Sequence, residues 1–259
     1  MITQDTLQAF RTDYKKYVSH LNTEVYKNNS AVERNLIHTD KVIENILILA
    51  NSLELSESEK YTAEALALFH DIGRFWILLQ DQQKIQNMDH AEASIEYLKS
   101  NSTFNSLDEQ SKMVITEVIL NHHAAEISKK DNPVSLFFSR LLRDADKLDI
   151  WRLTADSLAD RTKKSNLAIE YGLVEKPTLT TSFCQNIIEG GLPKKEDVAT
   201  FNDYLVFQMS WVFDLNFRKS FQLLNKMQYM RHIYEALPKH DMIFEIYRMI
   251  KIHIENQIL

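Results

Sequence analysis

The sequence FHDIGR at residues 69–74 decides the fold, because it sets an adjacent His70-Asp71 pair at the end of a helical pattern. Before this stretch, Ser56 and Glu59 have the spacing of a capping box, and apolar residues at helical spacing follow them. We therefore predict a helix that starts near Ser56 and reaches His70.

Helical patterns continue on both sides of this stretch. Only 4 glycines and 4 prolines occur in 259 residues, which argues against a chain of many short strands and hairpins. The Thr-rich stretch 173–183 leaves room for one short pair of strands. The predicted fold class is all-α. The further helix starts are a capping box of Ser30 with Glu33, a start near Asp89, a capping box of Ser106 with Glu109, and Pro133 in the first turn of a helix that runs to Asp146.

The glycines and prolines also divide the chain. Five of these eight residues lie within residues 161–195, which we interpret as an irregular connection. It separates a first helical domain at residues 1–160 from a C-terminal helical extension at residues 196–259. The extension is rich in apolar side chains, so we expect it to pack on the first domain. Its predicted helices span residues 201–214, 217–237 and 241–258.

Charge and composition limit the classes of partner. The net charge of -6 argues against a nucleic-acid polymer, because such proteins usually present a basic face to the phosphates. A small phosphorylated substrate suits an acidic chain when a bound metal supplies the positive charge. The single cysteine, the absence of signal-peptide character in MITQDTLQAF, and the absence of an apolar run of about 18 residues predict a cytoplasmic protein without a membrane segment. Whether it forms a homo-oligomer stays open.

Histidines and aspartates gather in the first half of the chain. Imidazole and carboxylate groups together suit Mn, Fe, Zn, Ni or Co better than a metal that prefers only oxygen. Separate helices can direct such side chains to one point inside a bundle. The candidate ligands are His38, the pair His70-Asp71, His90, the pair His122-His123, and Asp146.

These residues resemble the signature of the HD-domain superfamily, which consists of a His, a His-Asp pair and a later Asp. His38, His70-Asp71 and Asp146 match it in order, and residues 70–73 match its HDIG form. Residues 145–149, read as ADKLD, look like the last motif of the family. The resemblance covers roughly residues 25 to 155. It implies a helical HD-domain bundle and a metal-dependent phosphohydrolase.

The resemblance also implies a ligand set. His38, His70, Asp71 and Asp146 would bind a first metal, and His90 with His122 or His123 would bind a second, with Asp71 as the bridge. We favour His122 as the ligand, because neighbours on a helix point about 100° apart. His123 would then orient a ligand or contact substrate. The His-His doublet also resembles the HD-GYP phosphodiesterases, but the chain contains no Gly-Tyr-Pro motif.

The expected reaction is hydrolysis of a phosphomonoester or phosphodiester by a water that two divalent ions (Mn, Fe, Zn, Ni, Co or Mg) activate. Arg74 and Lys147 lie close to proposed ligands in the sequence and could donate charge-assisted hydrogen bonds to phosphate. The competing interpretation is that each forms an ion pair with a carboxylate. Asp149 lies one helical turn after Asp146 and could orient a ligand or handle a proton.

Two other functions remain open from the sequence. A minority of HD proteins hold a di-iron centre that activates oxygen, and others are catalytically inactive modules that bind a nucleotide. The complete ligand set argues against an inactive module. Iron that responds to oxygen would indicate an oxygenase, whereas phosphate release with Mn, Co, Ni or Mg would indicate a hydrolase. The sequence does not name the substrate.

Overall fold

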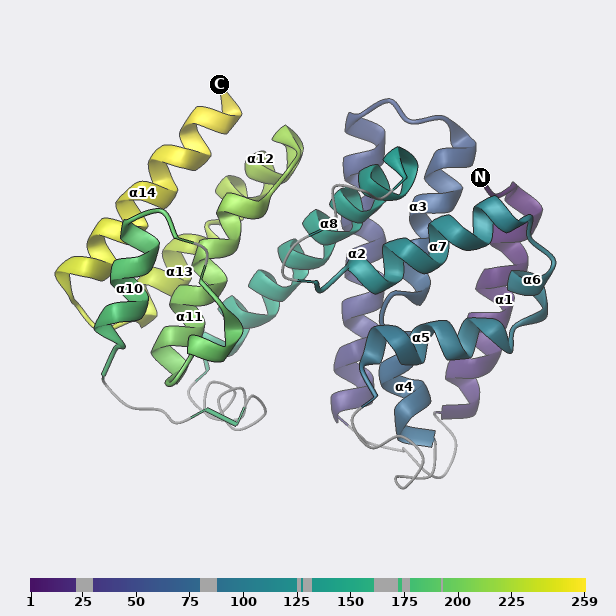
Figure 1. The fold of residues 1–259 in the computed structure, drawn as a ribbon, viewed down its shortest axis with the longest axis horizontal. Coiled ribbons are helices and arrows are strands. Elements are labelled where there is room, and N and C mark those ends of the chain that lie inside the picture. The colour runs from purple at the N-terminus through teal and green to yellow at the C-terminus, as the bar shows by residue number, and fades with distance from the viewer. Residues whose placement is uncertain are drawn as a thin grey trace. The chain divides into compact units, whose positions relative to one another are not determined.

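A computed structural model describes residues 1–21, 30–79, 88–124, 127, 132–160, 172–173, 178–191 and 193–259. The regular elements within these ranges are all helical, so the predicted all-α class is confirmed (Figure 1). Of the strand pair considered for residues 173–183, residues 174–177 lie outside the described ranges, and Thr181–Ile188 forms helix α10 instead. None of the described helices is both long and apolar enough to cross a membrane.

The chain divides into two compact units, Met1–Asp146 and Lys147–Leu259. The division falls inside one helix, whereas the sequence predicts the end of the first domain at residue 160. Each unit is described below by itself. The helices of the first unit are α1 (Gln4–Leu21), α2 (Ser30–Ser52), α3 (Glu57–Phe69), α4 (Ile72–Leu79), α5 (His90–Lys99), α6 (Ser102–Asn105), α7 (Glu109–Asn121) and the first part of α8 (Pro133–Leu158).

Helix α3 is the centre of the first unit. Every side chain from Thr62 to Phe69 is buried, as expected of a helix that other elements cover on all sides. Helix α2 packs along it, and α1 and α7 also contact it. Phe10 of α1 meets Phe69 edge to face, with ring centroids 5.1 Å apart. The His70-Asp71 pair follows directly after this buried helix, so the core itself fixes its position.

The observed N-terminal residues of the helices can be compared with the predicted ones. Ser56 and Glu59 form the predicted capping box, with the backbone N–H of Ser56 donating to Glu59 at 2.8 Å. Asp89 caps α5, and α8 begins at Pro133 as predicted. The capping box at Ser106 is wrong: Asp108 caps α7, because the short helix α6 uses Ser106 as its C-cap. The side chain of Ser30 lies outside the described residues.

The second unit contains the remainder of α8, which the sequence does not predict beyond Asp146. The apolar side chains of the second unit form one core, which includes the fully buried residues Trp151, Leu205 and Ile250. The predicted helix at residues 217–237 is two helices, because Gln228 adopts a left-handed conformation with φ of 57°. The other elements are α10 (Thr181–Ile188), η1 (Lys195–Asp197), α11 (Phe201–Ser210), η2 (Trp211–Asp214), α12 (Arg218–Met227), α13 (Tyr229–Ala236) and α14 (Asp241–Ile258).

The connection predicted at residues 161–195 is only partly irregular. Residues 161–171, 174–177 and 192 lie outside the described ranges. Within the remainder, α10 buries Phe183, Cys184 and Ile187 and packs against α14. This segment is therefore part of the second unit and not a simple linker.

Candidate metal centre

Three helices of the first unit bring His38, His70 and Asp146 together, and we call these residues the first ligand group. His38 comes from α2, His70 is the C-cap of α3, and Asp146 comes from α8. Nε2 of His38 lies 3.3 Å from Nε2 of His70 and 3.1 Å from Oδ1 of Asp146. All three side chains are buried, so this group is shielded from bulk water.

A backbone contact fixes which nitrogen of His70 faces the other ligands. Its Nδ1 donates to the carbonyl oxygen of Ala67 at 2.8 Å. Because a carbonyl only accepts, Nδ1 carries the proton and Nε2 presents a lone pair. Burial lowers the pKa of His70 to about 4, which keeps the ring neutral near pH 7. A neutral imidazole in this tautomer is the form that binds a metal.

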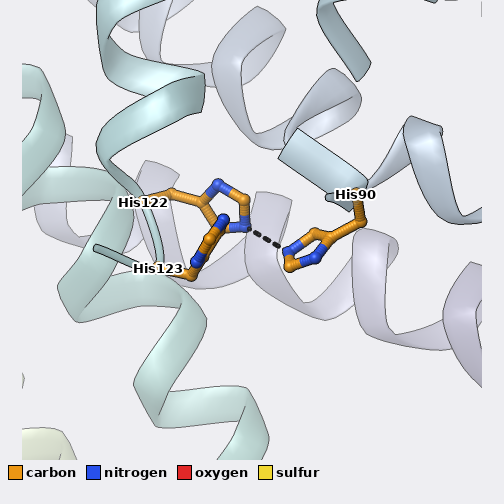
Figure 2. Close-up of side chains that lie close together, drawn as sticks. All are labelled: His90, His122 and His123. Carbon is orange, nitrogen blue, oxygen red and sulfur yellow. Dashed lines mark hydrogen bonds between the residues drawn. The ribbon is translucent and has the colours of Figure 1, made fainter. Parts of the chain in front are cut away.

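A second ligand group consists of His90, His122 and His123 (Figure 2). His90 is the first residue of α5, and the two other residues follow the end of α7. Nε2 of His90 lies 3.2 Å from Nε2 of His122, and Nδ1 of His122 donates to the carbonyl of Ile119 at 2.6 Å. His122 therefore presents Nε2 in the same way as His70 does. This group is more accessible, because His90 is half-buried and His123 is exposed.

Asp71 lies between the two groups. Its Oδ2 is 3.7 Å from Nε2 of His38 and 3.8 Å from that of His70. Its Oδ1 is 3.4 Å from Nε2 of His90 and 3.6 Å from that of His122. Among the described residues this buried Oδ1 has no hydrogen-bond partner. Each oxygen of a single carboxylate thus faces one ligand group.

The charges around the two groups favour ionised carboxylates and neutral imidazoles. Burial alone would raise the pKa of Asp71, but Arg74 and His70 outweigh it and hold that pKa well below its ordinary value. Asp146 is also buried, yet its hydrogen bond with His38 lowers its pKa to about 2. Burial lowers the pKa of His90 to about 3. These are the protonation states that metal ligands require.

The donor set and its spacing fit divalent metal ions. Two nitrogens about 2.0–2.1 Å from one ion lie roughly 3 Å apart when they are neighbouring ligands. The Nε2–Nε2 distances of 3.3 Å in the first group and 3.2 Å in the second match this spacing. An ion beside Asp71 would also satisfy its buried Oδ1. Nitrogen ligands combined with carboxylates suit Mn, Fe, Co, Ni or Zn.

Comparison with known protein families identifies the part of the chain that holds both groups. The sequence model of the HD-domain family matches residues 35–151. These residues are an HD domain. The superfamily is of the metal-dependent phosphohydrolase type, and its members bind divalent metals. No curated protein and no solved structure matches the chain significantly.

Gly73 of the HDIG motif lets two helices of the HD domain approach closely. A Cβ atom at this position would lie 2.0 Å from the carbonyl oxygen of His90 and 2.4 Å from the backbone nitrogen of Ser94. Ser94 also accepts a hydrogen bond from the Gly73 N–H at 2.9 Å, and its hydroxyl lies 2.9 Å from the carbonyl of His70. This contact between α4 and α5 sets the distance between His70 and His90.

Arg143 and Asp89 of the HD domain position the second ligand group, although the sequence did not predict either of them as a site residue. Arg143, buried on α8 one turn before Asp146, donates to the carbonyls of Asn121 at 3.1 Å and of Ala124. It thereby caps the end of α7 where His122 and His123 lie. Asp89 contacts His123 at 2.8 Å. The position of Arg143, three residues before a predicted ligand, is the only signal that the sequence offered for it.

The three further residues predicted for the site, Arg74, Lys147 and Asp149, each form an ion pair. Arg74 donates from Nε to Oδ2 of Asp71 at 2.6 Å, which is the ion pair of the competing interpretation, and its side chain is 44% exposed. Lys147 and Asp149 belong to the second unit. Lys147 pairs there with Asp214, and Asp149 accepts from Arg152 at 2.6 Å. Their expected roles toward phosphate or a ligand stay predictions.

The doublet at the end of α7 differs from its expected geometry. The prediction treated His122 and His123 as neighbours on a helix, about 100° apart. Helix α7 ends at Asn121, so both residues lie in the turn beyond it, and both come close to His90. The Nε2 of His123 faces Asp89 at 2.8 Å, whereas Nε2 of His122 faces Asp71 at 3.6 Å. This difference favours His122 as the ligand.

Proposed function

We propose that the chain hydrolyses a phosphomonoester or phosphodiester at a centre of two divalent ions bridged by Asp71. One observation carries the proposal: the two oxygens of Asp71 face two separate ligand groups, at 3.7 Å from His38 and 3.4 Å from His90. His38, His70 and Asp146 would hold one ion, and His90 with His122 the other. Paired ions of this kind serve many enzymes that cleave phosphate esters.

The residues of the centre have separate roles in this reaction. Bound divalent ions supply Lewis acidity toward a phosphoryl oxygen and lower the pKa of a water molecule. Asp71 and Asp146 offset the positive charge of the ions, while the tautomers of His70 and His122 keep a lone pair directed at them. Arg74 is the partly exposed cation beside Asp71. We expect it to exchange Asp71 for a substrate phosphate when an ion neutralises the carboxylate.

The proposed substrate is a small phosphorylated molecule such as a nucleotide. The net charge of -6 disfavours a long nucleic acid, which binds through a basic surface. The accessible side of the centre is the second ligand group, where His90 is half-buried and His123 is exposed. A phosphate that enters from this side meets Arg74, whose guanidinium lies 3.5 Å from Nε2 of His90.

The test is phosphate release from a panel of nucleotides, cyclic dinucleotides and sugar phosphates, assayed with Mn, Co, Ni and Mg. We expect metal-dependent turnover of at least one phosphate ester, and its loss in His70→Ala and Asp71→Ala. His232→Ala, an exposed histidine outside both ligand groups, is the matched control. Variants at His70 and Asp71 that behave like wild type in every assay contradict the proposal.

A di-iron oxygenase is the second candidate. The nitrogen-rich donor set around Asp71 suits iron as well as manganese. Purified protein that contains two irons, changes absorbance on exposure to oxygen and releases no phosphate from the panel supports the oxygenase. Phosphate release without such a response supports hydrolysis. Protein that shows neither response supports the inactive module.

A further inference from the structure

Asp89 connects the start of α5 to two of the three histidines of the second ligand group. It is the N-cap of this helix, and its Oδ1 accepts from the backbone N–H of Ala91 at 2.8 Å. The same oxygen lies 2.8 Å from Nε2 of His123. Its other oxygen, Oδ2, lies 3.5 Å from Nδ1 of His90. One carboxylate therefore contacts a helix end and two imidazoles.

Helix capping alone does not account for this arrangement. A cap needs one side-chain oxygen, and Ser or Asn at this position would supply it equally well. Asp89 differs from them in its negative charge and in its second oxygen, which faces His90. On the opposite edge of the same ring, Nε2 of His90 lies 3.4 Å from Oδ1 of Asp71. The ring of His90 thus lies between two carboxylates on separate elements.

This order of groups is the one by which a carboxylate orients a metal-binding histidine. A carboxylate near Nδ1 favours the proton on that nitrogen, directs the lone pair of Nε2 toward the metal and raises its basicity. His70 and His122 obtain the same tautomer from backbone carbonyls, those of Ala67 and Ile119. The Nδ1 of His90, by contrast, faces a charged side chain. A substitution can therefore remove this contact without altering the backbone.

We propose that Asp89 is a positioning residue that retains the second ion by orienting His90 and by holding His123 beside it. This inference rests on the two-ion centre proposed above. It predicts that Asp89 affects the second ion, because its described contacts are with Ala91, His90 and His123, whereas His38, His70 and Asp146 form the first ligand group. The charge of Asp89 matters for binding, whereas its capping oxygen matters for folding.

The test compares Asp89→Asn with Asp108→Asn. Both aspartates are N-caps of helices in the first unit, of 10 residues for α5 and 13 residues for α7, and both substitutions keep a capping oxygen while removing the charge. Asp108 caps α7 at its opposite end from His122 and contacts Ser111. Titration of the metal-free proteins with Mn²⁺ in a calorimeter gives the number of ions and their affinities. Thermal unfolding of the metal-free proteins gives the effect on folding.

We expect Asp108→Asn to bind two ions, each with the same affinity as in wild type. Asp89→Asn should bind the first ion as wild type does and the second about 10- to 100-fold more weakly. The melting temperatures of the two metal-free variants should change by similar amounts. Unchanged affinity for both ions in Asp89→Asn contradicts the role of Asp89 but not the two-ion centre. Wild type that binds fewer than two ions overturns the two-ion centre and this role with it.

Discussion

Oδ1 of Asp71 lies 3.4 Å from Nε2 of His90, although Asp71 lies in the turn between α3 and α4 and His90 is the first residue of α5. The other oxygen of the same carboxylate faces His38 at 3.7 Å. Replacing Asp71 with Asn keeps the shape of the side chain and removes the charge that two ions would share. We expect Asp71→Asn to lose at least about a hundred-fold in turnover, as when other preorganised electrostatic groups are removed.

The measurement is turnover together with metal content by mass spectrometry. Asp5→Asn, an exposed carboxylate in the first turn of α1, should keep both properties. Wild-type metal content and turnover in Asp71→Asn contradict the bridge.

The difference in burial between the ligand groups predicts two phases of metal loss. His38, His70 and Asp146 are buried, whereas His90 is half-buried and His123 is exposed. A chelator reaches the second group first, so a fast phase should remove one ion and most of the activity. A slower phase should remove the other. Stopped-flow release into a coloured chelator measures both, and a single phase that carries two ions would count against unequal sites.

Acid should destabilise the metal-free protein. Burial lowers the pKa of His70 from 6.5 to about 4, so between these values the unfolded chain binds a proton that the folded protein does not. The stability that depends on a neutral His70 is therefore fully present above pH 6.5 and is lost as the pH falls toward 4. It amounts to about 3 kcal/mol at most. Urea unfolding at pH 7.5 and pH 5 measures it. His70→Gln should show a smaller difference between the two pH values, and an equal difference contradicts this origin.

Gly73 should resist substitution because of the space around it. A Cβ would lie 2.0 Å from the carbonyl of His90, so Gly73→Ala must push α4 away from α5. Overpacking of this kind costs about 1–3 kcal/mol of unfolding free energy. The shift should also weaken binding of the second ion, because His90 moves. Glu92→Ala, an exposed change on α5, should stay within about 0.5 kcal/mol of wild type. A Gly73→Ala protein of unchanged stability would contradict the close contact.

Arg143 should stabilise the turn that carries His122 and His123. Arg143→Met removes donors to the partly buried carbonyls of Asn121 and Ala124, which should cost about 1–3 kcal/mol. Arg140→Met, an exposed arginine one turn earlier on α8, is the control and should cost much less. Denaturant unfolding of the two variants compares them. Equal losses in both would show that the contacts of Arg143 do not hold this turn.

Local patterns in the sequence predicted the helix starts at Ser56, Asp89 and Pro133 and the candidate ligands, because caps and the His70-Asp71 pair are short local motifs. The end of α3 at His70 is an example. Contacts between distant segments were not predictable in this way. Asp89 meets His123, and Arg143 meets the end of α7, through packing that no local motif records. The break at Gln228 was missed for a related reason, since a left-handed residue other than glycine has no clear signature.

The most direct test of the two-ion centre is anomalous X-ray diffraction from crystals of the protein grown with Mn²⁺. The account predicts two anomalous peaks on either side of Asp71, one beside His38, His70 and Asp146, and the other beside His90 and His122. A single peak, or manganese bound away from Asp71, would contradict the account.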